Sequence, residues 1–405
     1  MKILDPSKYN ILYLDSGSGI GGGQRSLLLL LKMLDKERWT PYVGCLGNSP
    51  FASEVGKTDA HVVPLTLPEA HNKTDKVQRF TIQDLLNDFR QLRVIGQLHK
   101  AVRQHRIALI HANSLSVALL GGVVAKWNRI PILMHKRYAT SYGILDKICE
   151  KLLQRVILVS EATRWDFASE TKQTLIYNGV DLDAFQATQA EVETLRTELF
   201  SGQNGSGHGG ENSKTRLVVG VVTRITPEKG IHFLVKAMAK LKESVLSNSA
   251  DVKLLIVGGP YFQKDYEYMA SLKQETTDLG VADSVIFTGF LSDTRVVTSL
   301  LDIVLVPSII PEACPRTIIE AMAVGKPVIA TPLGGSKELV TSETGILVSP
   351  ENAEEIASAI TELATNQDRL VRMGKAARQR AEQLFSCQKN TILTETVYTE
   401  LLTAR

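Results

Sequence analysis

Two glutamates in the second half of the chain have a spacing that suits the binding of vicinal hydroxyl groups. Glu312 and Glu320 are separated by seven residues in PEACPRTIIEAMAVGKPVIATPLGG, residues 311–335. The Pro-Arg pair between them predicts a helix start, so Glu312 would lie in the preceding loop and Glu320 one turn into the helix. Backbone N–H groups of residues 314–317 would then face an anion. The alternative is two exposed glutamates on a solvated helix.

Two cations lie on a predicted loop between a strand and a helix. Arg224 and Lys229 stand in GVVTRITPEKGIHFLVKAM, residues 220–238, in which a helix is expected to open near Gly230. Folds with parallel strands bind ligands at the carboxyl ends of those strands. A guanidinium and an ammonium suit a diphosphate, each contact being worth roughly 1.5–3 kcal/mol. The alternative is a solvated loop in which Lys229 pairs with Glu228.

A glycine-rich loop follows the first predicted strand. Three glycines of GSGIGGGQRS, residues 17–26, match G-x-G-x-x-G, the fingerprint of dinucleotide-binding folds. That fingerprint also requires an acid after the second strand, whereas the nearest acids, Asp35 and Glu37, precede it. An NAD-dependent oxidoreductase is therefore disfavoured. A loop that lets a phosphate approach the helix N-terminus and a purely structural tight turn remain.

Short apolar segments alternate with helical patterns along the whole chain, which predicts parallel α/β layers. We expect strands at 11–14, 42–45, 60–64, 109–110, 132–134 and 156–159, and a second series at 217–222, 253–257, 285–287, 303–306, 327–330 and 345–348. Two doubly wound sheets imply two domains that face each other across a cleft. We place them at 1–180 and 181–386, with a flexible segment at 201–215 and a last helix, 387–405, that packs back on the first domain.

Composition excludes several classes of protein. The 405 residues are 44% hydrophobic and 22% charged, as in an ordinary globular protein, and the net charge of +3 is too small for a nucleic-acid binder. The four cysteines lack C-x-x-C spacing, which excludes a zinc ribbon and indicates a reducing compartment. No apolar segment reaches the ~18–20 residues that cross a bilayer, and the N-terminus has no long apolar region, so we expect a cytoplasmic protein.

Basic residues of the first half gather between Lys73 and Arg106, on a predicted helix at 82–105 that also carries an apolar stripe. A helix packed on the sheet with a solvated face is one interpretation. The other is a basic surface for anionic lipid at the inner face of the cytoplasmic membrane.

These motifs together resemble the retaining glycosyltransferases of family 4, which have the GT-B architecture of two Rossmann-like domains. The spaced glutamates, the loop of Arg224 and Lys229, VGGP (257–260), FTGFLSD (287–293) and TGILVSP (344–350) follow that family's order. In the first half, the segments that agree with the family are GGGQRSLLLLLKML (21–34), IHANS (110–114), IPILMH (130–135) and LIYNGVDLDAF (175–185).

The resemblance implies roles for individual residues. Arg224 and Lys229 would neutralise the diphosphate of the donor, Glu320 would bind the ribose, and Glu312 would contact the transferred sugar. His135 would lie near the sugar and acceptor, although a satisfied core histidine is the alternative. The expected catalytic residues are Glu312, His135, Arg224 and Lys229. The expected donor-binding residues are Gly22, Gly23, Arg224, Lys229, Phe290, Leu291, Glu312, Ala313, Cys314, Pro315, Arg316, Thr317 and Glu320.

Two features qualify the resemblance. The family often has an acid directly after the histidine, whereas Lys136, Arg137 and Tyr138 follow here, so the resemblance is weaker on the acceptor side than at the donor site. Asp181 and Asp183 form a D-x-D pair of the kind that elsewhere holds Mg²⁺, but they follow Asn-Gly in a turn without further acids, and no metal or other cofactor is expected.

The expected function is transfer of a sugar, with retention and without metal, from a nucleoside-diphosphate sugar to a hydroxyl of a saccharide or lipid-linked acceptor. A sugar-nucleotide epimerase of the same fold and a non-catalytic sugar-nucleotide-binding protein are the alternatives. The sequence leaves the donor base, the sugar and the acceptor open.

Overall fold

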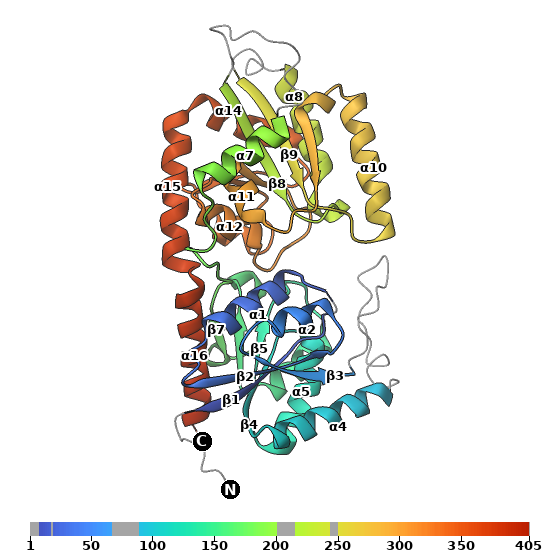
Figure 1. Ribbon diagram of the computed structural model, residues 1–405, viewed down its shortest axis with the longest axis vertical. Coiled ribbons are helices and arrows are strands. Elements are labelled where there is room, and N and C mark those ends of the chain that lie inside the picture. Colours follow the sequence, from blue (N-terminus) through green and yellow to red (C-terminus); the bar gives the residue numbers. More distant parts are fainter. Residues whose placement is uncertain (1–7, 18, 67–88, 201–214, 244–249, 405) are drawn as a thin grey trace. The chain divides into compact units, whose positions relative to one another are not determined.

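The chain forms two compact units, each built around one parallel sheet. The computed structural model describes residues 8–17, 19–66, 89–200, 215–243 and 250–404. Unit 1 contains Met1–Gly179 and Cys387–Arg405, and unit 2 contains Val180–Ser386 (Figure 1). The segment 201–215, which we predict to be flexible, lies outside the described residues apart from Thr215.

The sheet of unit 1 has the strand order β3-β2-β1-β4-β5-β6-β7, and all its pairs are parallel. The strands are β1 (Tyr9–Leu14), β2 (Trp39–Leu46), β3 (His61–Leu65), β4 (Ile107–Ala112), β5 (Ile132–Lys136), β6 (Arg155–Leu158) and β7 (Gln173–Leu175). In this register Leu12 lies opposite Tyr42 on one side and Ile110 on the other. The order reverses between β1 and β4, which is where doubly wound sheets bind their ligands.

Helices cover both faces of this sheet (Figure 1). One face carries α1 (Gly22–Met33), α2 (Pro50–Val55) and α16 (Cys387–Thr403). The other face carries α4 (Phe89–Gln104), α5 (Leu115–Asn128) and α6 (Ile144–Leu152). Two 3₁₀ turns, η1 (Glu161–Thr163) and η2 (Glu170–Lys172), precede β7. The strands are buried on both faces because each face has its own apolar core.

Helix α16 is part of the core of unit 1 although it comes last in the chain. Val397 and Tyr398 are 3% and 0% exposed and pack with the apolar residues of α1, α2 and β1. The Trp39 ring lies edge-on to Tyr398, with 5.5 Å between ring centroids. Unit 1 is therefore built from both ends of the sequence.

Unit 2 repeats the doubly wound plan with the order β10-β9-β8-β11-β12-β13, again with every pair parallel. Its strands are β8 (Thr215–Val222), β9 (Ala250–Val257), β10 (Val285–Gly289), β11 (Ile303–Val306), β12 (Val328–Ala330) and β13 (Gly345–Leu347). The predicted fold class, two Rossmann-like parallel-sheet domains, is thus confirmed. The predicted cleft between them stays a prediction.

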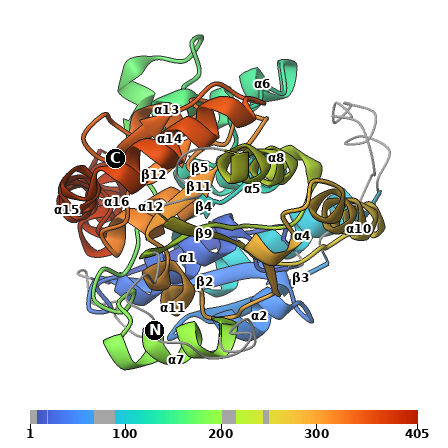
Figure 2. The same ribbon diagram turned by 90° about the horizontal axis from the view of Figure 1, so that it is seen from above.

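The helices of unit 2 also lie on both faces of its sheet. They are α7 (Gln189–Phe200), α8 (Ile231–Glu243), α10 (Gln263–Asp278), α11 (Thr294–Leu300), α12 (Arg316–Ala323), α13 (Ser336–Leu339), α14 (Ala353–Thr365) and α15 (Gln367–Leu384), with the 3₁₀ turns η4 (Pro227–Lys229) and η5 (Ala282–Ser284). Figure 2 shows α8 and α14 on one side of the strands and α7 and α11 on the other.

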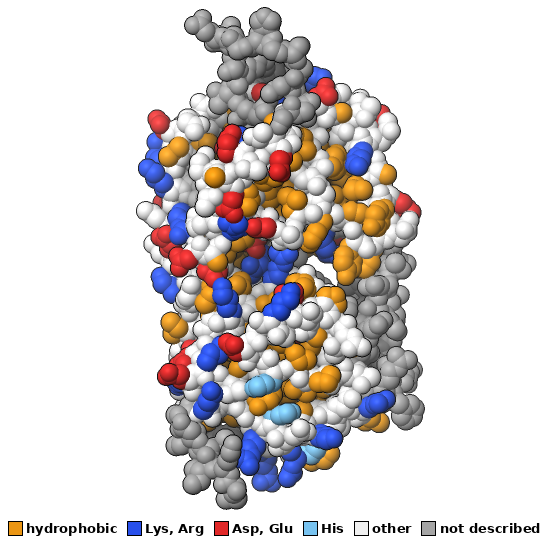
Figure 3. All heavy atoms as spheres, in the orientation of Figure 1, with side chains coloured by type: hydrophobic (Ala, Val, Ile, Leu, Met, Phe, Trp, Pro, Cys, Tyr) orange, Lys and Arg blue, Asp and Glu red, His pale blue; other side chains and the backbone are white. Residues whose placement is uncertain are grey.

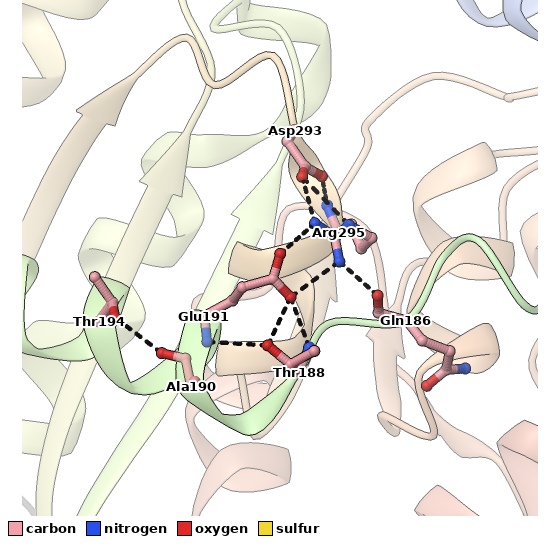
Figure 4. Close-up of polar contacts among 7 residues, drawn as sticks. All are labelled: Gln186, Thr188, Ala190, Glu191, Thr194, Asp293 and Arg295. Atoms are coloured by element: carbon pink, nitrogen blue, oxygen red, sulfur yellow. Dashed lines mark hydrogen bonds and ion pairs between the residues drawn. The ribbon is translucent and has the colours of Figure 1, made fainter.

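A charged clamp holds α7, where the chain enters unit 2, against the start of α11 (Figure 4). The Arg295 guanidinium contacts Glu191 at 2.7 Å and Asp293 at 3.0 Å, and it donates to the Gln186 carbonyl at 2.6 Å. The hydrogen bonds from Arg295, together with those from Thr188, lower the pKa of Glu191 to about 2. The clamp therefore persists over the physiological pH range.

Candidate functional site

The loop after β8 brings one of the two predicted cations against the first predicted glutamate. Lys229 ends η4, and its Nζ lies 2.8 Å from Oε2 of Glu312. The two side chains are 18% and 21% exposed. The alternative pairing with Glu228 is wrong, because the Glu228 carboxylate accepts a hydrogen bond from Thr226 instead. Arg224 is exposed, and no ion pair or hydrogen bond among the described residues holds its guanidinium.

Glu312 is fixed through its side chain and its backbone. The Ser308 hydroxyl donates to Oε1, so both carboxylate oxygens have partners. The Glu312 carbonyl accepts from the N–H of Gly335 at 2.7 Å, and Glu312 forms a bridge with Gly334. A Cβ at Gly334 would lie 2.2 Å from the Glu312 oxygen, and the φ of Gly334 is +60°. This position therefore requires glycine.

Helix α12 begins at Arg316, as predicted, and carries the second glutamate on its first turns. Glu320 is 7% exposed and pairs with Arg316, whose Nη2 lies 2.9 Å from Oε1. The Thr317 hydroxyl donates to the Val222 carbonyl at 2.9 Å, which fixes the helix start to the end of β8. Residues 313–317 thus form the turn between the two carboxylates. The backbone N–H groups of a first helical turn attract an anion through the helix dipole.

The loops after β9 and β10 add close backbone packing and exposed aromatic rings. Gly258 has a φ of +138°, and a Cβ there would lie 1.8 Å from the Thr223 carbonyl oxygen, so this loop packs directly on the loop of Arg224. Phe290 is 72% exposed and Tyr261 is 62% exposed. Figure 3 shows hydrophobic side chains at the surface of unit 2 over β9, β10 and α10. Phe290 and Tyr261 therefore present flat apolar area at the surface of unit 2.

The sequence predictions missed Ser308 and Tyr261. Ser308 follows β11, and Tyr261 follows the Gly-Gly-Pro turn after β9, so both stand at the carboxyl edge of the sheet. Their positions in the loops that follow buried strands are the signal that could have identified them. Leu291, next to Phe290, is partly buried in the same loop.

In unit 1 the glycine loop is held by a polar network at the carboxyl edge of β1, β4 and β5. One Asp15 oxygen accepts from the Gly17 N–H at 2.7 Å and from the Gln24 side chain at 2.8 Å, and the other accepts from Asn113 at 2.5 Å. Arg137 donates from Nε to Asn113 at 2.6 Å. The predicted residues Gly22 and Gly23 form the first turn of α1 beside this network.

His135 lines a small pocket at the same edge. The pocket is bounded by Ser26, Arg137 and Asn178, together with residues of α16 that include Asn390 and Thr394. His135 is 5% exposed, and its Nδ1 lies 2.7 Å from Nε2 of His111. Burial and the charge of Arg137 lower the pKa of both imidazoles well below the usual value, so both are neutral near pH 7. His135 is thus hydrogen-bonded in the core and also borders a pocket.

The two residues that replace the expected acid have separate surroundings. Lys136 is 2% exposed, lies over the Tyr138 ring at 4.4 Å, and donates to the Tyr138 carbonyl at 3.1 Å. Burial lowers its pKa to about 8, against the opposing charge of Asp146. Arg137 joins the network at the pocket instead. Only Arg137 of these two can therefore meet a ligand there.

The structure separates the predicted site residues by unit. In unit 2 it joins Lys229 to Glu312 and leaves Glu320 with Arg316. Gly22, Gly23 and His135 belong to unit 1. The D-x-D pair forms a turn, in which Asp181 accepts from the Ala184 N–H at 3.1 Å. Among the residues described, no three His, Cys, Asp or Glu side chains are grouped for metal binding.

The basic segment is described only in part. Lys73, Lys76, Arg79 and residues 82–88 of the predicted helix lie outside the described residues. In the described part, Val94, Leu98 and Val102 are buried against the sheet, whereas Leu92 of the same helix is 66% exposed. Lys100, Arg103 and Arg106 are exposed. None of the helices in the described ranges is long and apolar enough to cross a bilayer.

The fold of the chain is that of GT-B glycosyltransferases. HepE of Anabaena, solved in complex with UDP, superposes with a TM-score of 0.78 over 96% of this chain and 100% of that chain, at 24% identity. A glycosyltransferase from Rickettsia africae superposes with a TM-score of 0.80 over 98% and 99% of the two chains, at 23% identity. These likenesses define the class of fold.

The sequence comparisons define the family. The model described as Glycosyltransferase Family 4 matches residues 20–184, and the model described as Glycosyl transferases group 1 matches residues 209–380. The chain belongs to glycosyltransferase family 4. A Mycobacterium tuberculosis protein named GDP-mannose-dependent alpha-(1-6)-phosphatidylinositol monomannoside mannosyltransferase is 31% identical over 237 residues, which are 55% of this chain and 56% of that protein. The chain spans about half the length of the curated relatives it matches.

Proposed function

We propose that the chain transfers a sugar, with retention, from a nucleoside-diphosphate sugar to a hydroxyl group of a saccharide or lipid-linked acceptor. The observation that carries this proposal is the ion pair of Lys229 with Glu312 in the loop before α12, the helix that carries the paired Glu320. It sets a cation, a helix start and two carboxylates at the carboxyl edge of one sheet. HepE, which has this fold, was solved with UDP-glucose, which supports a sugar nucleotide as donor.

In the proposed reaction, the bond between the sugar C1 and the diphosphate breaks while a bond from C1 to the acceptor oxygen forms on the same face. Lys229 and Arg224 stabilise the negative charge that develops on the leaving diphosphate. The acceptor hydroxyl proton passes to an oxygen of that diphosphate. Glu312 acts by hydrogen bonding to the sugar rather than as a covalent nucleophile, since Ser308 and Lys229 already engage both of its oxygens.

The proposed reaction needs no metal or other cofactor. Two side-chain cations and the N–H groups at the start of α12 supply positive charge where the diphosphate would lie. Chelation of divalent ions is therefore expected to leave the transfer rate unchanged. Loss of activity with EDTA and its return with Mg²⁺ would contradict this part of the proposal.

The part of the proposal that concerns the transferred sugar and the acceptor rests on unit 1. The pocket beside His135 presents amide, guanidinium and hydroxyl groups, which suit a polyhydroxylated ligand. The exposed Lys100, Arg103 and Arg106 support a peripheral site for anionic lipid on the cytoplasmic face. Salt-sensitive binding to phosphatidylglycerol vesicles tests this, and absence of binding at low ionic strength would overturn it.

The donor is identified first by thermal shift with UDP, GDP and ADP. A nucleotide at 100 times its dissociation constant stabilises the folded state by about 2.7 kcal/mol. Products are then analysed by NMR with the matching ¹³C-labelled sugar nucleotides, with and without a panel of saccharide acceptors. A glycoside of unchanged anomeric configuration supports the proposal. An epimerised donor formed without acceptor would indicate the epimerase, and binding without any turnover would indicate the non-catalytic protein.

A further inference from the structure

A chain of four buried rings runs through unit 1 from α16 to the pocket of His135. The Tyr398 hydroxyl contacts the Tyr13 hydroxyl at 3.1 Å and His111 Nδ1 at 2.6 Å, and His111 Nε2 contacts His135 Nδ1 at 2.7 Å. Tyr13 and Tyr398 are 0% exposed, and His111 is 1% exposed. Because these contacts are shielded from water, the position of each proton in this series of hydrogen bonds depends on the neighbouring ring.

The direction of one of these hydrogen bonds sets the direction of the others. The Tyr398 hydroxyl donates its only proton to Tyr13, so its oxygen must accept from Nδ1–H of His111. A neutral imidazole has one N–H, and His111 Nε2 is therefore the acceptor of a proton held on His135 Nδ1. His135 then carries its own single proton on Nδ1, and its Nε2 has a free lone pair. Burial and the Arg137 charge keep both rings neutral.

The Nε2 atom of His135 is the part of the ring that a ligand can use. It has no hydrogen-bond partner among the described residues, and His135 borders the pocket of Ser26, Arg137 and Asn178. A lone pair accepts a hydrogen bond from a hydroxyl group and repels a phosphate or carbonyl oxygen. The opposite tautomer would present N–H and would prefer those oxygens instead.

We infer that Tyr398 and His111 are positioning residues that hold His135 as its Nδ1–H tautomer, so that its Nε2 accepts a hydrogen bond from a sugar hydroxyl. The choice of a sugar hydroxyl rests on the proposed function, whereas the tautomer does not. Tyr398 can contact His111 because it lies on α16, which packs on the sheet of unit 1 although it follows unit 2 in the sequence.

Two conservative variants each remove one oxygen and retain a ring. In Tyr13→Phe the proton of Tyr398 loses its acceptor and turns to His111 Nδ1. His111 must then donate from Nε2 to His135 Nδ1, which moves the His135 proton to Nε2 and reverses the tautomer. In Tyr398→Phe the Nδ1–H of His111 loses its acceptor, so the preference for one tautomer is expected to fall.

The test is long-range ¹H–¹⁵N correlation NMR of the full chain with ¹⁵N-labelled histidine at pH 7.5, with the His135 signals assigned by His135→Asn. The expected wild-type spectrum has a protonated Nδ1 and an unprotonated Nε2 for His135, and Tyr13→Phe exchanges the two. A protonated Nε2 in the wild type, which needs no variant to be observed, would overturn the inference. A tautomer unchanged in Tyr13→Phe would overturn it as well.

Calorimetry then tests whether His135 contacts the sugar of the ligand. It uses UDP and UDP-glucose, or the guanosine or adenosine pair if the thermal shifts select that base. Tyr13→Phe is expected to leave the nucleotide affinity unchanged and to lower the affinity for the sugar nucleotide about tenfold. Equal changes for the two ligands would refute the contact with a sugar hydroxyl. If the wild type turns over no donor, the proposed function fails while the NMR result still decides the tautomer.

Discussion

Replacing Arg224 and Lys229 by methionine, one at a time, tests whether these two cations bind a diphosphate. The two residues have different surroundings in the free protein. Arg224 is exposed without a partner among the described residues, whereas Lys229 pairs with Glu312 at 2.8 Å. Arg224→Met should therefore affect only the ligand, and Lys229→Met should affect both the ligand and the fold.

The expected magnitudes follow from these surroundings. A hydrogen bond to a charged group contributes roughly 1.5–3 kcal/mol, so either variant should bind a nucleoside diphosphate about 10- to 150-fold more weakly. A surface substitution such as Arg224→Met should change the free energy of unfolding by less than about 0.5 kcal/mol. Lys229→Met removes the partner of a carboxylate that is only 21% exposed, and it should cost about 1 kcal/mol of stability.

The assay is calorimetric titration of each variant with a nucleoside and with its diphosphate, together with urea unfolding. Lys236→Met is the matched control, because Lys236 is a half-exposed cation on α8 that faces Glu275 at 3.8 Å, outside the site. We expect the affinity for the diphosphate to fall and that for the nucleoside to stay unchanged. Equal losses for nucleoside and diphosphate, or equal losses in the control, would refute the reasoning.

Three further predictions concern the second glutamate, the glycine turn and the buried histidines. Glu320→Gln should weaken binding of a nucleoside diphosphate about tenfold and leave inorganic pyrophosphate binding unchanged, as measured by calorimetry, since Glu320 is proposed to bind the ribose. Gly334→Ala should lower the free energy of unfolding in urea by about 1–3 kcal/mol, because the methyl group would meet the Glu312 carbonyl, while Gly335→Ala, at a φ of −67°, should be neutral. Stability should fall as the pH falls below about 6.5, because the unfolded chain then binds protons that the buried His111 and His135 exclude. Urea unfolding should give a loss of about 3 kcal/mol between pH 7.5 and 5.5, and His135→Asn should halve it; an unchanged slope in that variant would contradict the assignment.

The fold could be predicted from the sequence because its signals are local. Buried strands are short apolar segments bounded by turns, and every predicted strand is present. β7 (Gln173–Leu175) was missed because three residues, two of them polar, give no period to detect. The start of α12 was predicted because proline fixes the backbone at a first turn.

The partners within the site could not be predicted in the same way. The contact of Lys229 with Glu312 joins residues 83 positions apart, and only the strand order brings β8 beside β11. The only protein partner that the sequence suggested for Lys229, as an alternative, was the adjacent Glu228, and the Glu228 carboxylate accepts from Thr226 instead. The link between His111 and Tyr398 spans 287 positions and depends on where α16 packs. Tertiary packing, rather than any local pattern, decides these pairs.

The discontinuous composition of unit 1 has a consequence for synthesis on the ribosome. Unit 2 is continuous in sequence and can complete its core once residue 386 has left the exit tunnel, whereas unit 1 lacks α16 until residues 387–403 have also been made. Unit 1 is therefore begun before unit 2 but completed after it. Until α16 has been made, the apolar residues of unit 1 that later contact Val397 and Tyr398 remain exposed. A ribosome stalled before residue 387 should accordingly carry a folded second unit and a chaperone-binding first one.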